Sequence, residues 1–390
     1  MSTAQPLRVA MIGTGFMGAA HSQAFRVAHR FFDLPLTPVM SVIVGRDAAK
    51  TQAAAEKYGW NEASTDWRAV IARDDIDLVD VCTSGETHAE IAIAALKAGK
   101  HVLCEKPLAN TVDEAREMAD AAREAAEHGI RSMVGFSYRR VPALTFARDL
   151  VQSGRIGEVR QARAAYLQDW LVDENGPMTW RLDKKLAGSG SLGDIGAHAV
   201  DSVQFITGQT VEQVSGHMTT FVKQRPLLGE TVGLSGTASD EMGEVTVDDA
   251  AWFTGLLSGG AVVSFEASRY ATGRKNGLKI EIFGSKGAIV FDLEKLNELE
   301  FYDGTDAAGE QGFRRIFVTE PEHPYTANWW PTGHGLGYEH AFSHQVRDLV
   351  FDIAEGRQPL PSFDDGLRVQ QVLAAVERSA GANGVFTPVA

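Results

Sequence analysis

The segment Gly13-Thr14-Gly15-Phe16-Met17-Gly18 limits what this chain can fold into more than any other part of its sequence. It follows the short apolar run Leu7 to Ile12 and precedes the helix-favouring stretch Ala19 to Arg30. In a strand–loop–helix unit, the first glycine permits a tight turn, the second lets the backbone approach a pyrophosphate, and the third lets the helix pack against the strand. The pattern predicts a dinucleotide site, with a ligand-free glycine turn as the alternative. The expected cofactor-binding residues of this loop are Gly13, Gly15, Phe16, Met17 and Gly18.

Apolar strands and helices alternate over the first third of the chain. We expect further strands at 39–44, 77–82, 101–104 and 131–135. Helices are expected at 47–58 and 87–98, and another begins at Thr111, where Glu114 completes a capping box. Near-continuous apolar strands between helices indicate a parallel sheet covered on both faces. The expected fold class of residues 1–135 is therefore α/β, a doubly wound Rossmann domain, with 31–38 as an apolar connection.

A different pattern begins after Arg140. A helix at 141–153 is followed by β-rich stretches at 159–171, 211–222, 250–257, 261–268, 278–283 and 288–291, and helices at 338–355 and 364–379 close the chain. Consecutive strands with few intervening helices indicate an open, mostly antiparallel sheet. We therefore expect residues 136–390 to form a second domain, of α+β class.

Charge and cysteine content narrow the class of partner. The chain has 37 Lys and Arg against 51 Asp and Glu, a net charge of −14. This balance disfavours nucleic acid and anionic membrane surfaces, which both require basic patches. Cys82 and Cys104 cannot form a disulfide framework and fit a reducing compartment. No apolar run approaches the roughly 18 residues of a membrane span, so we expect a cytoplasmic protein that binds a small molecule.

The end of the second strand bears on the choice of cofactor. An acidic residue there would bind the adenosine ribose and favour NAD, whereas an Arg pairs with the additional phosphate of NADP. The chain has Val44-Gly45-Arg46-Asp47. Arg46 is placed to contact that phosphate, to stack on adenine or to be solvated, and Asp47 fits the N-cap of the next helix. Either NAD or NADP therefore remains open, and Arg46 permits NADP.

Two sets of residues carry candidate chemistry. Lys106 follows an expected parallel strand, where its side chain would enter the ligand crevice. Asp194, His198 and Asp201 are spaced to share one helix face, so that a carboxylate could orient an imidazole acting as acid or base. An ordinary exposed helix pair is the alternative for the second set.

Together, Glu105-Lys106-Pro107 and Gly193-Asp194-Ile195-Gly196-Ala197-His198 resemble the glucose–fructose oxidoreductase/inositol dehydrogenase/MocA (Gfo/Idh/MocA) family. Tyr166 to Trp170, Thr179-Trp180-Arg181 and Ala187 to Gly190 resemble its levoglucosan dehydrogenase-like branch, as does the insertion at 31–38. The resemblance covers nearly the whole chain.

The resemblance implies NAD(P)-dependent oxidation of a secondary hydroxyl of a sugar, anhydrosugar or cyclitol. It implies Lys106, Asp194 and His198 as catalytic residues, a cis bond before Pro107, and a homodimer or homotetramer. Thr83-Ser84-Gly85 replaces the Thr-Pro-Asn that is frequent in the family, and Ser137 replaces a frequent Asn. Further cofactor contacts are expected from Thr83, His88, Glu105 and Lys106. Substrate contacts are expected from Tyr138, Arg139, Gln168, Asp169, Trp170, Trp180 and Arg181, with core or subunit packing as the alternative for the two tryptophans and solvation for Arg139.

In the expected mechanism His198 removes the hydroxyl proton, Lys106 stabilises the alkoxide, and Asp194 orients a substrate hydroxyl or His198. We expect the three groups to meet at one alcohol beside the nicotinamide. A sugar sensor without activity, or an enzyme that shuttles hydride between two sugars on a tightly held cofactor, are the alternatives. A zinc site built from His334, Glu339, His340 and His344 is a weaker one, because that helix carries an ordinary apolar face and the residues do not form an HExxH motif. We therefore expect no metal.

Overall fold

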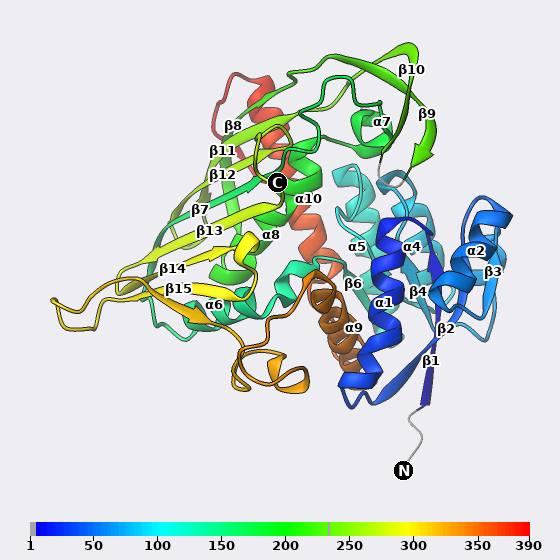
Figure 1. The fold of residues 1–390 in the computed structure, drawn as a ribbon, viewed down its shortest axis with the longest axis horizontal. Helices are drawn as coiled ribbons and strands as arrows, with labels where there is room; N and C mark the ends of the chain where they lie inside the picture. Colours follow the sequence, from blue (N-terminus) through cyan, green and yellow to red (C-terminus); the bar gives the residue numbers. More distant parts are fainter. Residues whose placement is uncertain (1–4, 233–234) are drawn as a thin grey trace. The chain divides into compact units, whose positions relative to one another are not determined.

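The computed structural model of the chain describes residues 5–232 and 235–390, within which two compact units are formed (Figure 1). The first unit contains the chain up to Ser137 together with Tyr338–Leu367, and the second contains Tyr138–Gly337 and Arg368–Ala390. The boundary expected after residue 135 lies close to the first crossing. We expected only one domain boundary, and the return of Tyr338–Leu367 to the first unit was not predicted.

The first unit is built on a parallel sheet with the strand order β3-β2-β1-β4-β5-β6. Its strands are β1 (Gln5–Ile12), β2 (Leu36–Val44), β3 (Glu62–Ser64), β4 (Leu78–Val81), β5 (His101–Cys104) and β6 (Ser132–Val134). The strand order reverses between β1 and β4, so the carboxyl ends of these two strands border the crevice where such sheets bind ligands. The predicted doubly wound parallel sheet is confirmed.

Helices connect these strands and cover the sheet. They are α1 (Phe16–Phe31), α2 (Ala48–Tyr58), α3 (Trp67–Ile71), α4 (His88–Lys97) and α5 (Val112–Glu127). From β1 to β3 the chain moves toward one edge of the sheet, and from β4 to β6 it moves toward the opposite edge. Because both sets of crossovers are right-handed, α1 and α4 lie on opposite faces of the sheet. Helix α5 begins with the predicted capping box of Thr111 and Glu114. Strand β4 is buried along its whole length, as a strand covered on both faces must be.

Helix α9 (Tyr338–Ala354) completes the first unit. Its apolar residues Phe342, Val346, Leu349 and Val350 are buried in one cluster with residues of β1 and α1. The sequence analysis identified this apolar face but assigned the helix to the second domain. Periodicity identifies a face that must be buried, and it does not identify the surface that buries it.

The second unit is centred on a sheet with the strand order β16-β15-β14-β13-β7-β12-β11-β8-β17. Neighbouring strands are antiparallel except β7 and β12, which confirms the mostly antiparallel sheet predicted here. A separate antiparallel pair is formed by β9 and β10. The strands are β7 (Val159–Leu167), β8 (Val211–Thr219), β9 (Gln224–Val232), β10 (Ser235–Glu244), β11 (Ala250–Leu257), β12 (Val262–Ser268), β13 (Gly277–Gly284), β14 (Gly287–Asp292), β15 (Glu298–Asp303), β16 (Arg314–Phe317) and β17 (Thr387–Pro388).

Helices of the second unit pack on one face of this sheet. Helix α6 (Pro142–Gln152) contacts α8 (Ala197–Thr207), and the two contact β14 and β7 respectively. Accordingly, Ala162 and Ala164 of β7 are buried, whereas Arg163 between them points to the other face and pairs with Glu281 at 3.6 Å. The remaining helices are α7 (Lys184–Ala187) and α10 (Phe363–Gly381), which begins in the first unit. Within residues 5–232 and 235–390, no helix is long and apolar enough to span a bilayer.

The segment 31–38 differs from the connection expected there. Leu36, Thr37 and Pro38 form the start of β2, and Pro38 pairs with Leu7. Strand β3 pairs only with residues 42–44 of β2, so the missing N–H of Pro38 interrupts no hydrogen bond on that side.

His101 at the start of β5 links the stability of the first unit to pH. Burial lowers the pKa of His101 to about 4, with the Arg131 guanidinium acting in the same direction and Asp77 opposing it. Its Nδ1 accepts the backbone N–H of Arg131 at 3.0 Å. Because this pKa lies below the ordinary value of about 6.5, the contribution is complete above about pH 6.5 and is lost as the pH falls toward about 4.

Replacing His101 with Asn should remove part of the acid sensitivity, because Asn retains an acceptor for Arg131 but does not titrate. Between about pH 7 and about pH 5, the variant is expected to lose about 1–2 kcal/mol less unfolding free energy than the wild type. Urea titrations at both pH values measure the difference, with the exposed His128→Asn as the control for histidine content. Equal losses in the His101→Asn variant and the wild type would contradict the assignment.

Candidate active site

The loop after β1 approaches neighbouring backbone too closely for side chains at two of its three glycines. Gly13 has φ +121°, and a Cβ there would lie 2.5 Å from the carbonyl oxygen of Cys82. A Cβ on Gly18 would lie 2.2 Å from the Gly13 carbonyl oxygen, whereas Gly15 faces open space. Gly15 is the N-cap of α1 and makes no side-chain cap. The first N–H groups of α1 therefore suit a pyrophosphate, and the loop fits a dinucleotide.

Phe16 and Met17 open α1 in different surroundings. Phe16 is half exposed, and its ring stacks on Tyr338 of α9 with centroids 6.2 Å apart. Met17 is partly buried against the core of the unit. Phe16 thus presents an apolar surface beside the glycine loop, whereas Met17 packs inward.

The end of β2 has little room for the acidic side chain that binds a ribose in many such domains. A Cβ on Gly45 would lie 2.4 Å from Oγ1 of Thr51 and 3.0 Å from Cγ2 of Thr14. Asp47 accepts the backbone N–H of Lys50 at 2.9 Å and caps α2. Arg46 is exposed between them. The N-cap interpretation of Asp47 is confirmed.

His88 joins the loops that follow β4 and β5. Its Nδ1 lies 3.1 Å from the carbonyl oxygen of Pro107, and its Nε2 lies 3.1 Å from that of Thr83. The ring is buried, so it holds both loops from inside the unit. The Lys106–Pro107 bond is cis, as the resemblance implies. These contacts gather Thr83, Lys106 and the glycine loop at the carboxyl ends of β4, β5 and β1.

The segment carrying Asp194 and His198 is not a regular α-helix. Leu192–Gly196 forms a π-helical turn that leads into α8, so Asp194 lies in this turn and His198 in the α-helix. The Asp248 carboxylate accepts the N–H groups of Gly190 and Leu192 at 2.7 and 2.8 Å. It also accepts the hydroxyl of Ser191 at 2.6 Å. Asp248, which sequence reasoning missed, therefore fixes the start of this segment.

Asp194 contacts a buried arginine rather than standing alone on a helix surface. Its Oδ2 lies 3.5 Å from Nη1 of Arg269, whose side chain is fully buried and lies over the Trp170 ring at 5.5 Å. Arg181 also interacts electrostatically with Asp194. Burial lowers the pKa of Arg181, and the negative charge of Asp194 opposes that shift. The structure thus brings the predicted residues Asp194, Trp170 and Arg181 together around Arg269, which sequence reasoning missed.

A chain of hydrogen bonds begins at a tyrosine whose ring packs against His198 and continues toward the predicted substrate residues. The His198 ring lies 4.5 Å from that of Tyr138, centroid to centroid. The hydroxyls of Tyr138 and Tyr166 are 2.8 Å apart, and Tyr166 donates to Oδ1 of Asn276 at 2.7 Å. Because the Tyr166 proton is used on Asn276, Tyr138 is the donor between the two tyrosines.

The same asparagine continues the chain to the first substrate loop. Gln168 donates to Oδ1 of Asn276 at 2.7 Å, and the Trp170 indole donates to Oε1 of Gln168 at 3.0 Å. Tyr166 lies in a stretch that the sequence analysis had quoted, but Asn276 lies in a distant loop before β13 and gave no signal. The predicted residues Tyr138, Gln168 and Trp170 are therefore members of one network with His198 at its end.

Two predicted substrate residues have charged partners within the second unit. Arg139 is buried and bonds the Asp201 carboxylate through Nε and Nη2, at 2.9 and 2.6 Å. Asp169 accepts from Lys275 at 2.7 Å, a hydrogen bond that lowers the pKa of Asp169. Trp180 is 39% exposed, with the Arg181 guanidinium 4.4 Å from its ring centroid. The Asp201 carboxylate thus pairs with Arg139.

The histidines on α9 do not gather around a metal position. His344 is fully buried and meets Phe32 edge-on, with ring centroids 5.9 Å apart, whereas His340 contacts the neighbouring Glu339. In the part of the chain that the structure describes, the one group of potential ligand atoms close enough for an ion is His21, Asp80 and Cys82.

Comparisons with known proteins match both units. A profile described as an oxidoreductase family with an NAD-binding Rossmann fold matches residues 7–136, and one described as the GFO/IDH/MocA C-terminal domain matches residues 144–290. Levoglucosan dehydrogenase from Pseudarthrobacter phenanthrenivorans is 40% identical over 381 residues, which cover 96% of each chain.

Solved structures give the same result. An oxidoreductase domain protein from Kribbella flavida has a TM-score of 0.95 at 60% identity, covering 99% of this chain and 100% of that one. Levoglucosan dehydrogenase in complex with NADH and levoglucosan has a TM-score of 0.92 at 40% identity, with coverage of 99% and 100%.

Removing the Asp248 carboxylate should destabilise the second unit. Asp248→Ala leaves two backbone N–H groups and one hydroxyl without their buried acceptor, and it is expected to lower the free energy of unfolding by about 2–4 kcal/mol. Asp240→Ala, at an exposed position of the same unit, should change it by less than about 0.5 kcal/mol. Denaturant titrations of both variants measure the difference, and equal stabilities would show that Asp248 does not hold the segment.

Proposed function

Because this chain belongs to the GFO/IDH/MocA family of NAD-dependent oxidoreductases, we propose that it oxidises a secondary hydroxyl of an anhydrosugar, with related sugars and cyclitols as further candidates. Levoglucosan is the first substrate to test, since levoglucosan dehydrogenase matches this chain along 96% of both chains. The observation that carries the proposal is the network in the second unit. It links a histidine to hydroxyl, amide and indole groups of the kinds that recognise a sugar.

His198 acts as the general base in the proposed reaction. An imidazole is the side chain best matched to proton removal near neutral pH. His198 takes the proton of the substrate hydroxyl, and NAD, when bound, would supply the hydride acceptor. The Tyr138 ring packs against the His198 ring at a tilt of 33°, which restricts rotation of the imidazole and supports a fixed direction of proton removal.

Lys106 and Asp194 complete the proposed catalytic set. Lys106 donates to the reacting oxygen and stabilises the negative charge that develops on it. Asp194 orients a neighbouring substrate hydroxyl, and its contact with Arg269 fixes the direction of the carboxylate. The assignment of Lys106 and Asp194 is supported by the Glu105-Lys106-Pro107 and Gly193 to His198 motifs.

Substrate recognition combines aromatic surfaces with directed hydrogen bonds. Trp170 and Trp180 are 42% and 39% exposed, and such indole faces suit the apolar face of a sugar ring. We assign hydrogen bonding to Tyr138, Gln168 and Arg181. Arg139 and Asp169, whose charges are bonded to Asp201 and Lys275, support these contacts from within the unit.

NAD would be held by the glycine loop and by the loops that His88 joins. The proposed contacts are the N–H groups at the start of α1, with Thr83 and Lys106 at the neighbouring strand ends. Arg46 adds tolerance for NADP, because the position before it is glycine and Asp47 is used as a helix cap. Turnover with both cofactors tests this tolerance.

Self-association and location complete the proposal. Trp252, Leu256 and Val262 are exposed on one face of β11 and β12, where Leu256 pairs with Val262. An apolar patch on a sheet is normally covered, and we propose that pairing through this face gives a homodimer or homotetramer. Cys82 and Cys104 are free and buried, which supports a reducing compartment such as the cytoplasm.

Substitution of the proposed base gives the direct test of function. With a panel of levoglucosan, other anhydrosugars, glucose and inositols, His198→Asn should lower kcat by about 10²- to 10⁴-fold, while NADH affinity stays within about twofold. Lys106→Arg should retain more turnover than Lys106→Ala if charge rather than geometry dominates. Nicotinamide absorbance measures turnover, and the exposed His217→Asn is the control.

Other results would change the assignment. Full turnover by His198→Asn would exclude it as the base. A wild-type protein that binds NADH and sugar without turnover would be a sensor. If the cofactor co-purifies with the protein and the first sugar is oxidised only when a second sugar is present, the enzyme exchanges hydride between two sugars.

A further inference from the structure

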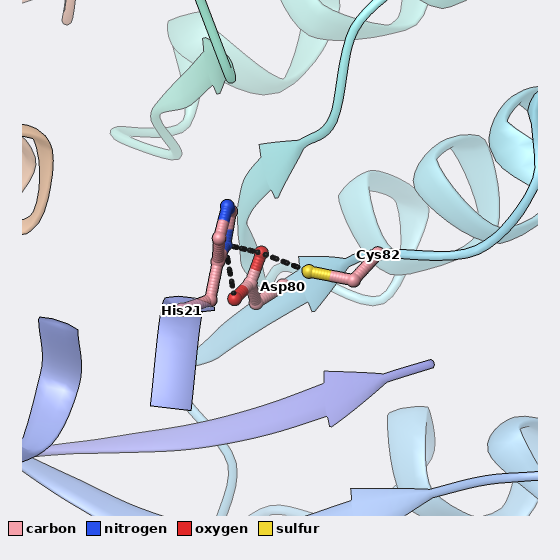
Figure 2. Close-up of side chains that lie close together, drawn as sticks. All are labelled: His21, Asp80 and Cys82. Carbon is pink, nitrogen blue, oxygen red and sulfur yellow. Dashed lines mark hydrogen bonds and ion pairs between the residues drawn. The ribbon is translucent and has the colours of Figure 1, made fainter. Parts of the chain in front are cut away.

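A buried ionic cluster lies beneath the loops of the first unit. His21 of α1 points toward Asp80 of β4, and Cys82 at the end of that strand approaches the same carboxylate (Figure 2). Nδ1 of His21 lies 2.9 Å from Oδ2 of Asp80, and Nε2 lies 2.9 Å from Oε1 of Glu105. His21, Asp80 and Glu105 are at most 4% exposed. Neither the proposed proton transfer nor the nucleotide loop uses His21.

Both ring nitrogens of His21 face carboxylate oxygens. A neutral imidazole has one N–H, so it can donate to one ionised carboxylate but not to both. Burial alone would lower the pKa of His21, but the charge and hydrogen bond of Asp80 outweigh it and raise that pKa well above its ordinary value. Both contacts are therefore best satisfied by the doubly protonated ring.

A metal ion fits this cluster poorly. His21 and Asp80 are already at hydrogen-bonding distance, which leaves no space for an ion between them. Burial raises the pKa of the Cys82 thiol, and the thiol donates to Asp80 at 3.5 Å, so Cys82 does not present a thiolate. Metal binding requires a deprotonated thiol and a free imidazole lone pair.

Glu105 transmits the position of His21 to the loop that carries Lys106. While Oε1 binds His21, Oε2 accepts the backbone N–H of Lys106 at 3.2 Å. A Cβ on Gly135 would lie 2.5 Å from Oε1, so the carboxylate occupies space that a side chain at that position would fill. His21 and the Lys106 backbone thus hold one carboxylate oxygen each.

Helix α9 packs against the cluster through Phe342. The ring of Phe342 lies 5.4 Å from that of His21, and Tyr338 packs on Phe342 at 5.0 Å. Tyr338 also stacks on Phe16 at the start of α1. The returning segment of the chain therefore keeps water from the imidazole and strengthens its bonds to the two carboxylates.

We propose that His21 is a positioning residue, whose doubly protonated ring holds Glu105 and, through Glu105, the backbone of Lys106. This inference rests on the proposed function, in which Lys106 contacts the reacting hydroxyl. A small displacement of such a group lowers the rate strongly even when binding is preserved.

Steady-state kinetics of His21→Gln, Glu105→Gln and the double variant test the proposal. Each single variant should lower kcat about tenfold or more with the best sugar of the panel, while KM for NAD stays within about threefold. The double variant should lose no more than the worse single variant, because the two residues act as one unit. His344→Gln, which alters a buried histidine of α9 outside the cluster, should keep the wild-type kcat. Unchanged kcat in His21→Gln, or losses that multiply in the double variant, would overturn the proposal.

Two measurements test the positioning role of His21 without requiring turnover. Nitrogen-15 NMR of the wild-type protein with NADH should show His21 protonated on both nitrogens at about pH 8, and a neutral ring or a stoichiometric bound metal would overturn the proposal. The backbone amide of Lys106 should shift in His21→Gln, and an unmoved amide would overturn it equally. If the wild type oxidises no sugar while both signals are found, the proposed function fails and the link between His21 and the Lys106 backbone stands.

Discussion

In each unit, one segment of the proposed site runs so close to neighbouring backbone that one of its residues must be glycine. A Cβ on Gly13 would lie 2.5 Å from the Cys82 carbonyl oxygen, and one on Gly190 would lie 1.7 Å from that of Asp248. Such contacts leave the backbone one available path, because interiors are close-packed and neither partner can move aside. The start of α1 and the start of the π-helical turn are therefore set by main-chain contact rather than by exposed side chains.

Buried polar side chains then fix the loops that these contacts bring together. His88 joins the loops after β4 and β5, the His21–Glu105 pair holds the backbone of Lys106, and Asp248 caps the segment before Asp194. Each of these groups would be costly to leave unpaired, by about 1–3 kcal/mol, so each hydrogen bond specifies one arrangement of its loop. In this way a rigid scaffold orients side chains that lie outside its hydrophobic core.

Sequence reasoning predicted the features that are local and periodic. The glycine loop, the capping box at Thr111, the parallel sheet of the first unit and the mostly antiparallel sheet of the second are confirmed. Short elements such as β3 and α3 are too brief to show a period, and β15 and β16 were not predicted. The return of α9 was missed because its apolar face fits a helix in either unit.

The candidate site was predicted where its residues lie in motifs and missed where they lie far apart in sequence. Asn276 and Arg269 bind residues more than 70 positions away, and nothing near them in the chain marks them. The π-helical turn at Leu192–Gly196 was also missed, since the spacing of Asp194 and His198 suggested one regular helix. Arg139 was expected near substrate, but its charge is paired with that of Asp201, a pairing that depends on tertiary structure.

The most direct test of the central claim is a crystal structure of this protein with NADH and levoglucosan, or with the best sugar of the panel. One secondary hydroxyl oxygen is expected within about 2.6–3.2 Å of both the His198 imidazole and the Lys106 amine, with the hydrogen on that carbon directed at the nicotinamide. A bound sugar whose nearest hydroxyl contacts neither group, or whose C–H points away from the nicotinamide, would contradict it.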